Sequence, residues 1–360
     1  MKNICFLVGN LNNPGGTERV TTLVANGLSE KNFNISILNI VNGCSPFFKL
    51  HDSIKTSRIH NFEKNIMVNF FYTIWKIRNY VISQKIDTLI VVDSISCIFT
   101  VPALIGLNIK HICWEHFNFN VDLGVKYRNW GRILAAKYCD NVVTLTNRDR
   151  ELWLEGIRSD KMKAKLVTIP NPNPYENLNV SSYSEREKVV IAVGRLTSQK
   201  GFDLLIKAWA KLSEQDNEWI LKIIGNGEDK ESLELLAKEH NVYSSIKFIP
   251  ATKNIESFYK QASIFCLSSR YEGFGMVILE AQAFGLPVVS FDCNCGPSDL
   301  IQHGKNGYLV PCEDFDELSK NLAKLMSLSK DDFMDYSNDA YLNANKFNID
   351  KLLNLWLDIV

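Results

Sequence analysis

Short apolar runs alternate along this chain with longer segments in which apolar residues recur every three or four positions. The short runs are typical of buried strands, and the longer segments are typical of amphipathic helices. The alternation continues through both halves of the chain. Strands that alternate with helices predict parallel sheets with helices on both faces, so the expected fold class is α/β with doubly wound sheets.

The same alternation gives the bounds of the expected elements. In the first half, strands are expected at Ile4–Val8, Ile35–Ile40, Asp87–Val92, His111–Trp114, Val142–Leu145 and Leu166–Ile169. Helices are expected there at Thr17–Ser29, Val68–Ser83, Tyr127–Lys137 and Arg148–Glu155. In the second half, strands are expected at Val189–Val193, Trp219–Ile224, Ile246–Ile249, Ile264–Leu267 and Val288–Phe291. Helices are expected there at Phe202–Leu212, Lys230–His240, Glu256–Lys260, Val277–Phe284 and Phe315–Leu328.

A linker separates the two halves. Asn171–Pro174 reads Asn-Pro-Asn-Pro, and the polar stretch Tyr175–Glu187 follows it. Such a stretch breaks regular structure, and 360 residues suit two domains with separate cores. We therefore expect one domain over residues 1–175 and a second over 176–344. An amphipathic helix in the last segment, residues 345–360, is expected to pack back onto the first domain.

Composition narrows the class of protein. A hydrophobic fraction of 46% and a charged fraction of 22% are typical of soluble globular chains. The longest apolar run, Ile95–Leu107, contains Pro102 and is too short to cross a bilayer, so it predicts a buried helix. No signal peptide is expected. The nine cysteines are scattered, which predicts reduced thiols in the cytosol that pack mostly as small hydrophobic groups.

The net charge of zero hides an asymmetry between the halves. Residues 1–175 carry 21 Lys and Arg against 13 Asp and Glu, a net charge of +8, which leaves −8 on the remainder. This predicts different partners for the two halves, with an anionic lipid or a phosphorylated acceptor near the first. A dispersed excess without a patch explains the count equally well. No nucleic-acid partner is expected.

Loops at the carboxyl ends of strands are where doubly wound sheets bind ligands. After Ile4–Val8 comes a loop that ends in Gly15-Gly16, where the backbone can approach a ligand closely, and Thr17 can cap the next helix. A loop of this kind before a helix start favours a diphosphate as the ligand. The loop is neither G-x-G-x-x-G nor a P-loop, and a Gly-Gly turn is often a turn and nothing more.

A second strand end carries two cations. Val189–Val193 is followed by Gly-Arg-Leu-Thr-Ser-Gln-Lys-Gly, which contains Arg195 and Lys200. Arg195 can bind a diphosphate through two N–H groups, and Lys200 can act as a mobile point charge. Two solvated surface cations are the alternative.

Two glutamates and a histidine complete the candidate residues. Glu272 stands before a helix start and Glu280 lies inside the helix, so two acceptors flank free backbone N–H groups, as a ligand with hydroxyls and phosphates requires. Such a spacing also arises by chance. His116 follows the strand His111–Trp114 and can donate to a sugar hydroxyl, although most lone histidines are packed or exposed.

No metal ion is expected. The sequence has no Asp-x-Asp after a strand, no His-Glu-x-x-His and no paired Cys/His ligand set. Side-chain cations and the N-terminal ends of helices are therefore expected to bind negative charge in place of Mg²⁺ or Mn²⁺.

Together these segments resemble glycosyltransferase family 4, the retaining enzymes of the GT-B fold. The resemblance rests on Gly15–Arg19, Val193–Phe202, Ile224–Gly227, Glu272–Glu280 and Gly285–Val288, with Glu115-His116 matching in the first domain. Their order and spacing agree over nearly the whole chain. The resemblance implies two Rossmann-like domains that face each other across a cleft.

The resemblance also implies a role for each candidate residue. Arg195 and Lys200 would hold the donor diphosphate and stabilise its charge as it leaves, and Gly16 would bring backbone close to it. Glu280 would bind the ribose, and the loop around Ile249 would face the base.

The remaining roles concern the sugar. Glu272 would contact hydroxyls of the donor sugar, helped by the backbone N–H groups of Phe274, Gly275 and Met276. His116 matches the histidine that such enzymes place near the sugar and the attacking acceptor.

The implied activity is transfer of a hexose or N-acetylhexosamine from a nucleotide-sugar, such as UDP-galactose, UDP-N-acetylgalactosamine or UDP-glucose, to a hydroxyl of a saccharide. Gly296-Pro-Ser-Asp-Leu-Ile301 strengthens the resemblance to bacterial members that build capsule, O-antigen or exopolysaccharide. The acceptor would be linked to polyprenyl diphosphate. The enzyme would work in the cytoplasm, peripherally on the inner face of the membrane.

Three points stay open. The aromatic segment Phe70–Trp75, followed by Lys76 and Arg78, can contact an anionic membrane or can form one buried helix face. A nucleotide-sugar 2-epimerase of the GT-B fold would bind the same donor. A non-catalytic nucleotide-sugar-binding subunit would keep the fold without the transfer.

Overall fold

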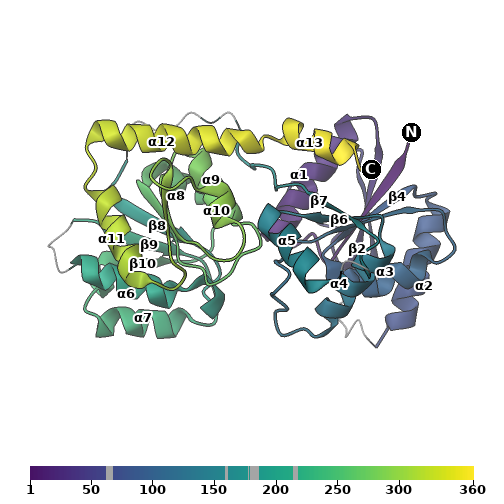
Figure 1. Ribbon diagram of the computed structural model, residues 1–360, viewed down its shortest axis with the longest axis horizontal. Coiled ribbons are helices and arrows are strands. Elements are labelled where there is room, and N and C mark those ends of the chain that lie inside the picture. Colours follow the sequence, from purple (N-terminus) through teal and green to yellow (C-terminus); the bar gives the residue numbers. More distant parts are fainter. Residues whose placement is uncertain (62–67, 159–160, 177, 179–185, 214–217) are drawn as a thin grey trace. The chain divides into compact units, whose positions relative to one another are not determined.

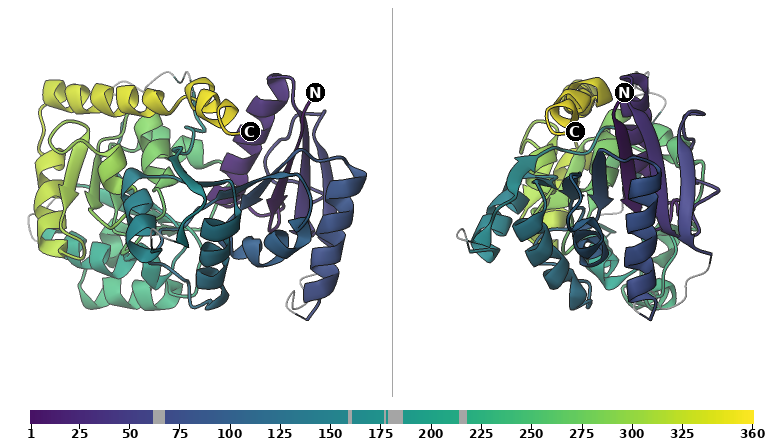
Figure 2. Two further views of the ribbon diagram at one scale, coloured as in Figure 1. Left: turned by 45° about the vertical axis from the view of Figure 1, so that its right-hand side comes forward. Right: turned by 90° about the vertical axis from the view of Figure 1, so that its right-hand side faces the viewer.

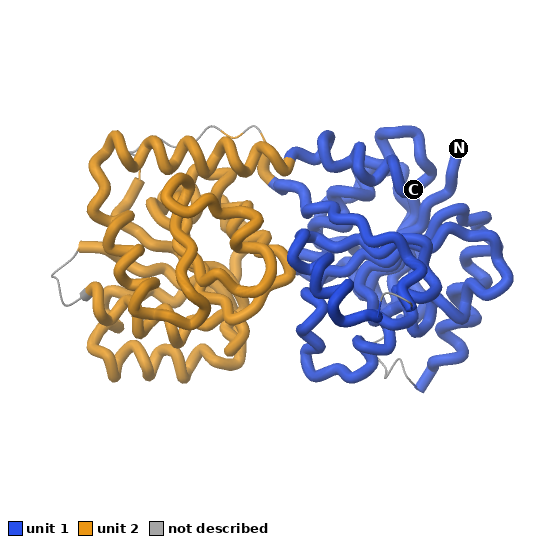
Figure 3. Tube along the Cα trace, viewed as in Figure 1, with its two compact units in different colours: residues 1–174, 348–360 blue, residues 175–347 orange. Residues whose placement is uncertain are grey.

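The computed structural model describes residues 1–61, 68–158, 161–176, 178, 186–213 and 218–360. These residues form two compact units, residues 1–174 with 348–360 and residues 175–347 (Figure 3). The first unit thus ends one residue before the expected boundary at 175, and the returning segment starts at Asn348. Within the expected linker, residues 177 and 179–185 lie outside the described residues.

The first unit is built on a seven-stranded sheet in the order β3-β2-β1-β4-β5-β6-β7, and all its strand pairs are parallel (Figure 1). Its strands are β1 Asn3–Val8, β2 Asn34–Val41, β3 Lys55–His60, β4 Thr88–Val92, β5 Lys110–Trp114, β6 Asn141–Thr144 and β7 Lys165–Thr168. Its helices are α1 Gly16–Glu30, α2 Phe70–Ser83, α3 Cys97–Leu104, α4 Tyr127–Tyr138, α5 Asn147–Gly156 and α13 Ile349–Leu357, with a 3-10 turn η1 at Ser94–Ser96.

Helices cover both faces of this sheet, as Figure 2 shows. Because side chains alternate along a strand, Cys5 and Leu7 face one side, where they share a core with residues of α2, α3, α4 and α5. On the other side Trp114 of β5 meets Trp356 of α13, with the two ring centroids 4.7 Å apart. Helix α13 also packs against α1. The last segment of the chain is therefore part of the core of the first unit.

The second unit is built on a six-stranded sheet in the order β10-β9-β8-β11-β12-β13, again with parallel pairs throughout. Its strands are β8 Val189–Val193, β9 Ile220–Ile224, β10 Ile246–Ile249, β11 Ile264–Leu267, β12 Val288–Phe291 and β13 Gly307–Val310. Its helices are α6 Phe202–Ser213, α7 Lys230–Glu239, α8 Ile255–Gln261, α9 Met276–Ala283, α10 Pro297–Leu300, α11 Phe315–Met326 and α12 Lys330–Ala344, with 3-10 turns η4 Ser198–Lys200, η5 Tyr243–Ser245 and η6 Asn345–Phe347.

Helix α12 is held to the second unit by buried hydrogen bonds. Ser337 Oγ donates to the carbonyl of Gly285 at 2.7 Å, and Asn343 Nδ2 donates to Gln282 Oε1 at 3.0 Å and to the carbonyl of Leu300 at 2.8 Å. These acceptors lie in α9, after it, or at the end of α10. Buried partners of this kind are costly to remove, so α12 fixes the position of α9.

The sequence pattern missed four elements. Strand β3, Lys55–His60, is a polar edge strand, and β13, Gly307–Val310, is a short edge strand that begins with glycine, so neither has the apolar run of a central strand. Helix α12 was not among the expected helices, and α10 is a four-residue helix. The buried helix expected within Ile95–Leu107 is confirmed as α3, and no helix among the described residues is long and apolar enough to span a bilayer.

Replacing Trp356 with alanine should lower the free energy of unfolding of the first unit by about 3–5 kcal/mol, because the fully buried ring would leave a cavity beside Trp114. Urea unfolding followed by far-ultraviolet circular dichroism measures the change. Leu355→Ala on the same helix, where the side chain is 40% exposed, is the matched control and should cost less than about 1 kcal/mol. Equal losses in both variants would show that α13 does not anchor through Trp356.

Candidate active site

The second unit places the predicted donor residues where its strand order reverses, between β8 and β11. The loop after β8 carries Arg195 and Lys200, and the loop after β11 carries Glu272. The two loops touch at Gly201, which has a φ of +60° and whose absent Cβ would lie 2.0 Å from the carbonyl oxygen of Ser268. Only glycine allows both this conformation and this close approach. The two predicted motifs therefore meet in space.

Lys200 and Glu272 form an ion pair, with Nζ 2.5 Å from Oε1. The same carboxylate oxygen accepts a hydrogen bond of 2.7 Å from Ser269 Oγ. Both side chains are largely buried, so the pair is weakly screened by solvent. An ammonium has three N–H donors, so Lys200 can hold Glu272 and still bind a phosphate oxygen.

Arg195 and Arg270 have different environments. Arg195 is exposed at the end of β8 and makes no ion pair with any residue that the structure describes. Arg270 binds both carboxylate oxygens of Asp203 at 2.9 and 2.8 Å and also reaches Glu313. Arg270 thus fastens the loop of Glu272 to the start of α6, whereas Arg195 is available for a ligand.

Helix α9 begins directly after this loop. Gly275 occupies the N-cap position in the left-handed conformation, with a φ of +87°, and Met276 is the first helical residue. The N–H groups of a first helical turn have no acceptor within the helix and therefore suit an oxygen of a ligand. Phe274 before them is buried, so the backbone at the helix start is held in place.

Glu280 lies one turn further along α9. It is buried and accepts a hydrogen bond of 3.1 Å from Tyr259 Oη. Ile249 ends β10 and is half-buried, and the exposed Pro250 follows it. The predicted donor residues of this unit thus lie in the loops after β8 and β11, at the end of β10, and in α9.

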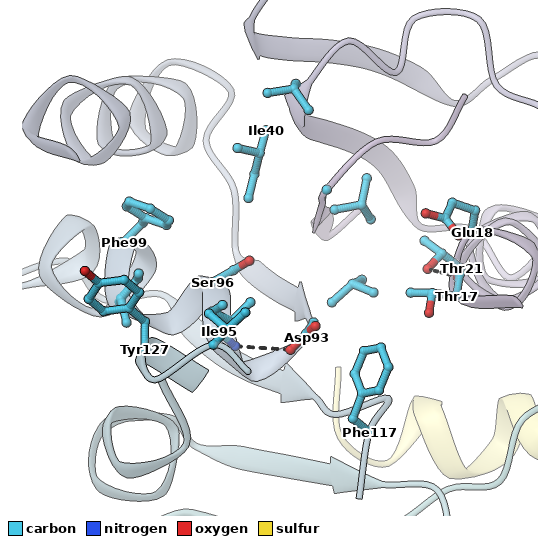
Figure 4. Close-up of a pocket in the computed structure, with 16 residues that line it drawn as sticks. Thr17, Glu18, Thr21, Ile40, Asp93, Ile95, Ser96, Phe99, Phe117 and Tyr127 are labelled. Atoms are coloured by element: carbon cyan, nitrogen blue, oxygen red, sulfur yellow. Dashed lines mark hydrogen bonds between the residues drawn. The ribbon is translucent and has the colours of Figure 1, made fainter. Parts of the chain in front are cut away.

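The first unit holds a pocket of about 450 Å³ at its own strand-order reversal, between β1 and β4. In Figure 4, Thr17, Glu18 and Thr21 of α1 line one side, Phe99 and Tyr127 line the other, and Asp93 lies between them. Most of the lining is apolar, with few polar groups. A pocket of this size and composition is typical of a site for a small molecule or for part of a larger ligand.

Asp93 directly follows β4 and has an unusual backbone conformation, with a φ of +80°. Arg128 NH1 lies 2.6 Å from its Oδ1. Burial and the nearby charge of Glu115 raise the pKa of Asp93 to about 6, although Arg128 opposes the shift. A strained residue with a shifted pKa at the floor of a pocket is typical of functional sites.

Glu115 organises the loop after β5. Its buried carboxylate accepts hydrogen bonds from Ser94 Oγ at 2.5 Å, from Arg132 Nε at 3.3 Å, and from the backbone N–H groups of His116 and Phe117 at 3.1 Å each. A buried carboxylate requires such compensation. Both of its oxygens accept hydrogen bonds, so Glu115 positions the loop.

His116 lies on this loop, and its ring packs on Trp114 at a centroid distance of 4.5 Å. It is buried, and its Nε2 has no hydrogen-bond partner among the described residues. Burial lowers the pKa of His116 to about 3. The imidazole is therefore neutral near pH 7 and offers a ligand one nitrogen as donor or acceptor, without positive charge.

The expectation that Thr17 caps α1 is wrong. The helix begins at Gly16, Gly15 is its N-cap residue, and no side chain caps it. The carboxylate of Glu18 lies over Gly15, where a Cβ would come within 2.2 Å of Oε2. Gly16 remains exposed at the helix start, beside the residues that line the pocket.

Sequence reasoning missed Asp93 and the partners of Glu115. Asp93 follows a predicted strand, so the rule that selected His116 would have selected it too. Arg128 and Arg132 lie on α4 and gave no local signal, because only the packing of α4 brings them to the loop. Gly131 between them allows that packing, since a Cβ there would lie 2.3 Å from the carbonyl oxygen of Ser94.

The neutral state of His116 predicts how stability changes with pH. An unfolded histidine binds a proton below about pH 6.5, whereas folded His116 does so only near pH 3. Between these values the unfolded state holds the extra proton, so this group costs the folded state stability as pH falls, by up to about 1.4 kcal/mol per pH unit. Urea unfolding at several pH values should therefore show wild type losing stability relative to His116→Gln on acidification. A difference independent of pH would contradict the assigned neutral state.

Family models match both halves of the chain. The model described as Glycosyltransferase Family 4 matches residues 14–172, and the model described as Glycosyl transferases group 1 matches residues 176–343. An uncharacterized glycosyltransferase of Haemophilus influenzae is 36% identical over 360 residues, which cover 100% of both chains.

Two further comparisons also match this chain to glycosyltransferases or to their fold. The GalNAc-alpha-(1->4)-GalNAc-alpha-(1->3)-diNAcBac-PP-undecaprenol alpha-1,4-N-acetyl-D-galactosaminyltransferase of Campylobacter jejuni is 27% identical over 367 residues, covering 100% of this chain and 98% of that protein. The crystal structure of Anabaena Alr3699/HepE in complex with UDP is similar in fold, with a TM-score of 0.82 at 18% identity over 99% of each chain. The two Rossmann-like units are those of a GT-B fold, and the chain belongs to glycosyltransferase family 4, as an enzyme related to those of polysaccharide biosynthesis.

Proposed function

We propose that this glycosyltransferase moves a hexose or N-acetylhexosamine from a UDP-sugar to a hydroxyl of a saccharide linked to polyprenyl diphosphate, with retention of the anomeric configuration. The observation that carries the proposal is the ion pair of Lys200 with Glu272 at the strand-order reversal of the second unit, on the loop that also carries Arg195. Cations for a diphosphate and an acceptor for sugar hydroxyls are gathered there on rigid strand ends.

The donor occupies this site in the second unit. Arg195 binds the diphosphate through its fork of N–H groups, while Lys200 bridges Glu272 and a phosphate oxygen. Glu272 and the N–H groups of Phe274, Gly275 and Met276 bind the sugar. These groups stabilise the negative charge that develops on the leaving diphosphate, which is the charge that catalysis must stabilise in the transition state.

Glu280 and Ile249 serve the nucleoside. Glu280 accepts hydrogen bonds from the ribose hydroxyls, in addition to the one from Tyr259. The backbone after Ile249 faces the base. Gly16, at the exposed start of α1 in the first unit, leaves its backbone open to an oxygen of a diphosphate.

The acceptor occupies the first unit. Its reacting hydroxyl binds near His116, whose buried Nε2 has no hydrogen-bond partner among the described residues, and its sugar ring lies in the pocket floored by Asp93. Asp93, with a pKa near 6, accepts a hydrogen bond from an acceptor hydroxyl when it is ionised. The apolar lining suits the C–H faces of sugars and their acetamido methyl groups.

The acceptor oxygen attacks the anomeric carbon from the face that the diphosphate leaves. The bond from that carbon to the diphosphate oxygen breaks, the new glycosidic bond forms, and the hydroxyl proton passes to the departing phosphate oxygen. The products are the extended saccharide and UDP. We propose that this transfer uses no Mg²⁺ or Mn²⁺, because side-chain cations meet the leaving charge.

The comparisons support the substrate classes. The Campylobacter relative is named for transfer of N-acetylgalactosamine to an undecaprenol-diphosphate oligosaccharide, and a relative from Erwinia amylovora is named for amylovoran biosynthesis. The HepE structure contains UDP. We therefore place the reaction in the biosynthesis of capsule, O-antigen or exopolysaccharide, on the cytoplasmic face of the membrane.

Release of UDP from a panel of UDP-sugars, with and without extracted polyprenyl-diphosphate oligosaccharides, tests the proposal. Release that depends on the acceptor, with an extended lipid-linked product in the mass spectrum, supports it. A free epimerised sugar formed without acceptor would assign a 2-epimerase instead. Tight UDP-sugar binding without any release would assign a non-catalytic subunit.

Arg195→Ala should slow turnover by at least about a hundredfold, because it removes one charge-assisted contact to the leaving group, worth about 2.7–4 kcal/mol in comparable sites. Initial rates of UDP release at saturating acceptor measure the effect. Lys305→Ala, which removes an exposed cation elsewhere in the same unit, is the matched control and should retain wild-type activity. Activity of Arg195→Ala within threefold of wild type would exclude the assigned role.

Helix α2 offers a surface for the membrane. Its buried face contains Thr73, Ile77 and Val81, whereas Phe71 is 83% and Trp75 is 53% exposed. Lys76 lies over the ring of Trp75, with Nζ 5.5 Å from its centroid. Aromatic side chains with an adjacent cation are typical of helices that bind anionic membrane surfaces.

Arg78 does not belong to this surface. Its NH1 donates to the carbonyl oxygens of Ala103 and Ile105 at 2.8 Å each, so it caps the end of α3. We propose that the exposed aromatic side chains and Lys76 hold the enzyme on the membrane that carries its acceptor. Arg78 is therefore not one of the side chains that would contact lipid.

The double variant Phe71→Glu/Trp75→Glu should bind phosphatidylglycerol vesicles at least about tenfold more weakly than wild type, since burying each aromatic side chain contributes about 1.5–3 kcal/mol. Flotation of the purified chain with vesicles measures binding. Leu235→Glu, at a side chain 57% exposed in the second unit, controls for added charge and should float like wild type. Equal flotation of wild type and the double variant would refute this surface.

A further inference from the structure

Three side chains that bind metals in proteins come together in the core of the first unit. They are Cys97 at the start of α3, His111 on β5 and Cys139 directly after α4, and one ligand atom from each lies within 4.8 Å of those of the others. All three side chains are buried. They are far apart in the sequence, so the search for Cys/His ligands at local spacing did not bring them together.

The ligand types point to one class of metal. Two thiolates and an imidazole suit zinc, which prefers sulfur and nitrogen in a tetrahedral arrangement. With Zn–S near 2.3 Å and Zn–N near 2.0 Å, tetrahedral ligand atoms lie about 3.5–3.8 Å apart. Cys139 Sγ and His111 Nδ1 are 3.5 Å apart, which fits this geometry.

A further thiol lies beside Cys97. Cys113 is two residues after His111 on β5, so the two side chains face the same side of the sheet. The Cys113 thiol hydrogen-bonds to Cys97. It is not among the ligand atoms that all lie within 4.8 Å of one another, so it borders the cluster of three.

The backbone around the histidine is fixed. The N–H of His111 donates to Asp140 Oδ2 at 2.7 Å, directly after Cys139. His111 Nε2 is buried and has no hydrogen-bond partner among the residues that the structure describes. The backbone hydrogen bond thus holds His111 in the cluster, and no polar group among the described residues hydrogen-bonds to its Nε2.

We propose that Cys97, His111 and Cys139 bind a structural zinc ion that fastens α3 and α4 to β5, with the Cys113 thiol beside Cys97. Arg132 lies on α4, Glu115 directly follows β5, and Asp93 precedes the turn that leads into α3. The ion therefore stabilises the elements that position the candidate acceptor site. The ion takes no part in glycosyl transfer. The proposal therefore does not depend on the function proposed above.

Metal analysis of the full-length chain, purified under reducing conditions without a polyhistidine tag, tests the proposal. Inductively coupled plasma mass spectrometry should find about one zinc per chain. Cys97→Ser and Cys139→Ser should each lose at least about tenfold of the bound zinc. Cys5→Ser is the matched control, because Cys5 is buried in the same core outside the cluster, and it should keep its zinc.

X-ray absorption at the zinc edge of the wild-type chain needs no variant. It should show sulfur neighbours near 2.3 Å and a nitrogen neighbour near 2.0 Å. Zinc with oxygen neighbours alone, zinc retained by both cluster variants, no metal, or copper or iron in place of zinc would each overturn the proposal. Thiol titration of the denatured, metal-free chain should find all nine cysteines reduced; two fewer would indicate a disulfide and would also overturn it.

Discussion

Parallel strand pairing is the constraint on which both units depend. Each strand of a parallel sheet is followed by a crossover, so the carboxyl ends of all strands meet at one edge of the sheet. Where the strand order reverses, neighbouring strands send their crossovers to opposite faces, and their loops separate to leave room for a ligand. The reversal lies between β1 and β4 in the first unit and between β8 and β11 in the second. Asp93 lies at the first of these points and Arg195, Lys200 and Glu272 lie at the second, because the topology leaves backbone and side chains accessible there.

Buried charge fixes the loop after β5 in the first unit. Glu115 is out of contact with water, so the loop after β5 must supply N–H groups and Arg132 to offset the cost of burial. That requirement determines where His116 lies. Arg195 in the second unit is exposed, and it makes no ion pair with any residue that the structure describes.

The sequence pattern located most of the fold because buried strands have strong local signals. Val189–Val193 and Ile264–Leu267 were predicted with the bounds that the structure has. Strand β3 was missed because an edge strand can be polar on its exposed side, and β13 was missed because it is short and begins with glycine. Thr17 was misjudged as a cap because a helix start can shift by one residue without any change in the apolar pattern.

The sequence by itself determined the alternation of strands and helices and the loops that carry Arg195, Lys200 and Glu272, because hydrophobic period and glycine placement act locally. Tertiary structure alone decided that Lys200 pairs with Glu272 across 72 positions, that His116 is neutral, and that His111 meets two distant cysteines. Ion pairing, desolvation and metal-ligand geometry depend on which groups surround an atom in space. Those neighbours are set by long-range packing, which a single sequence does not display.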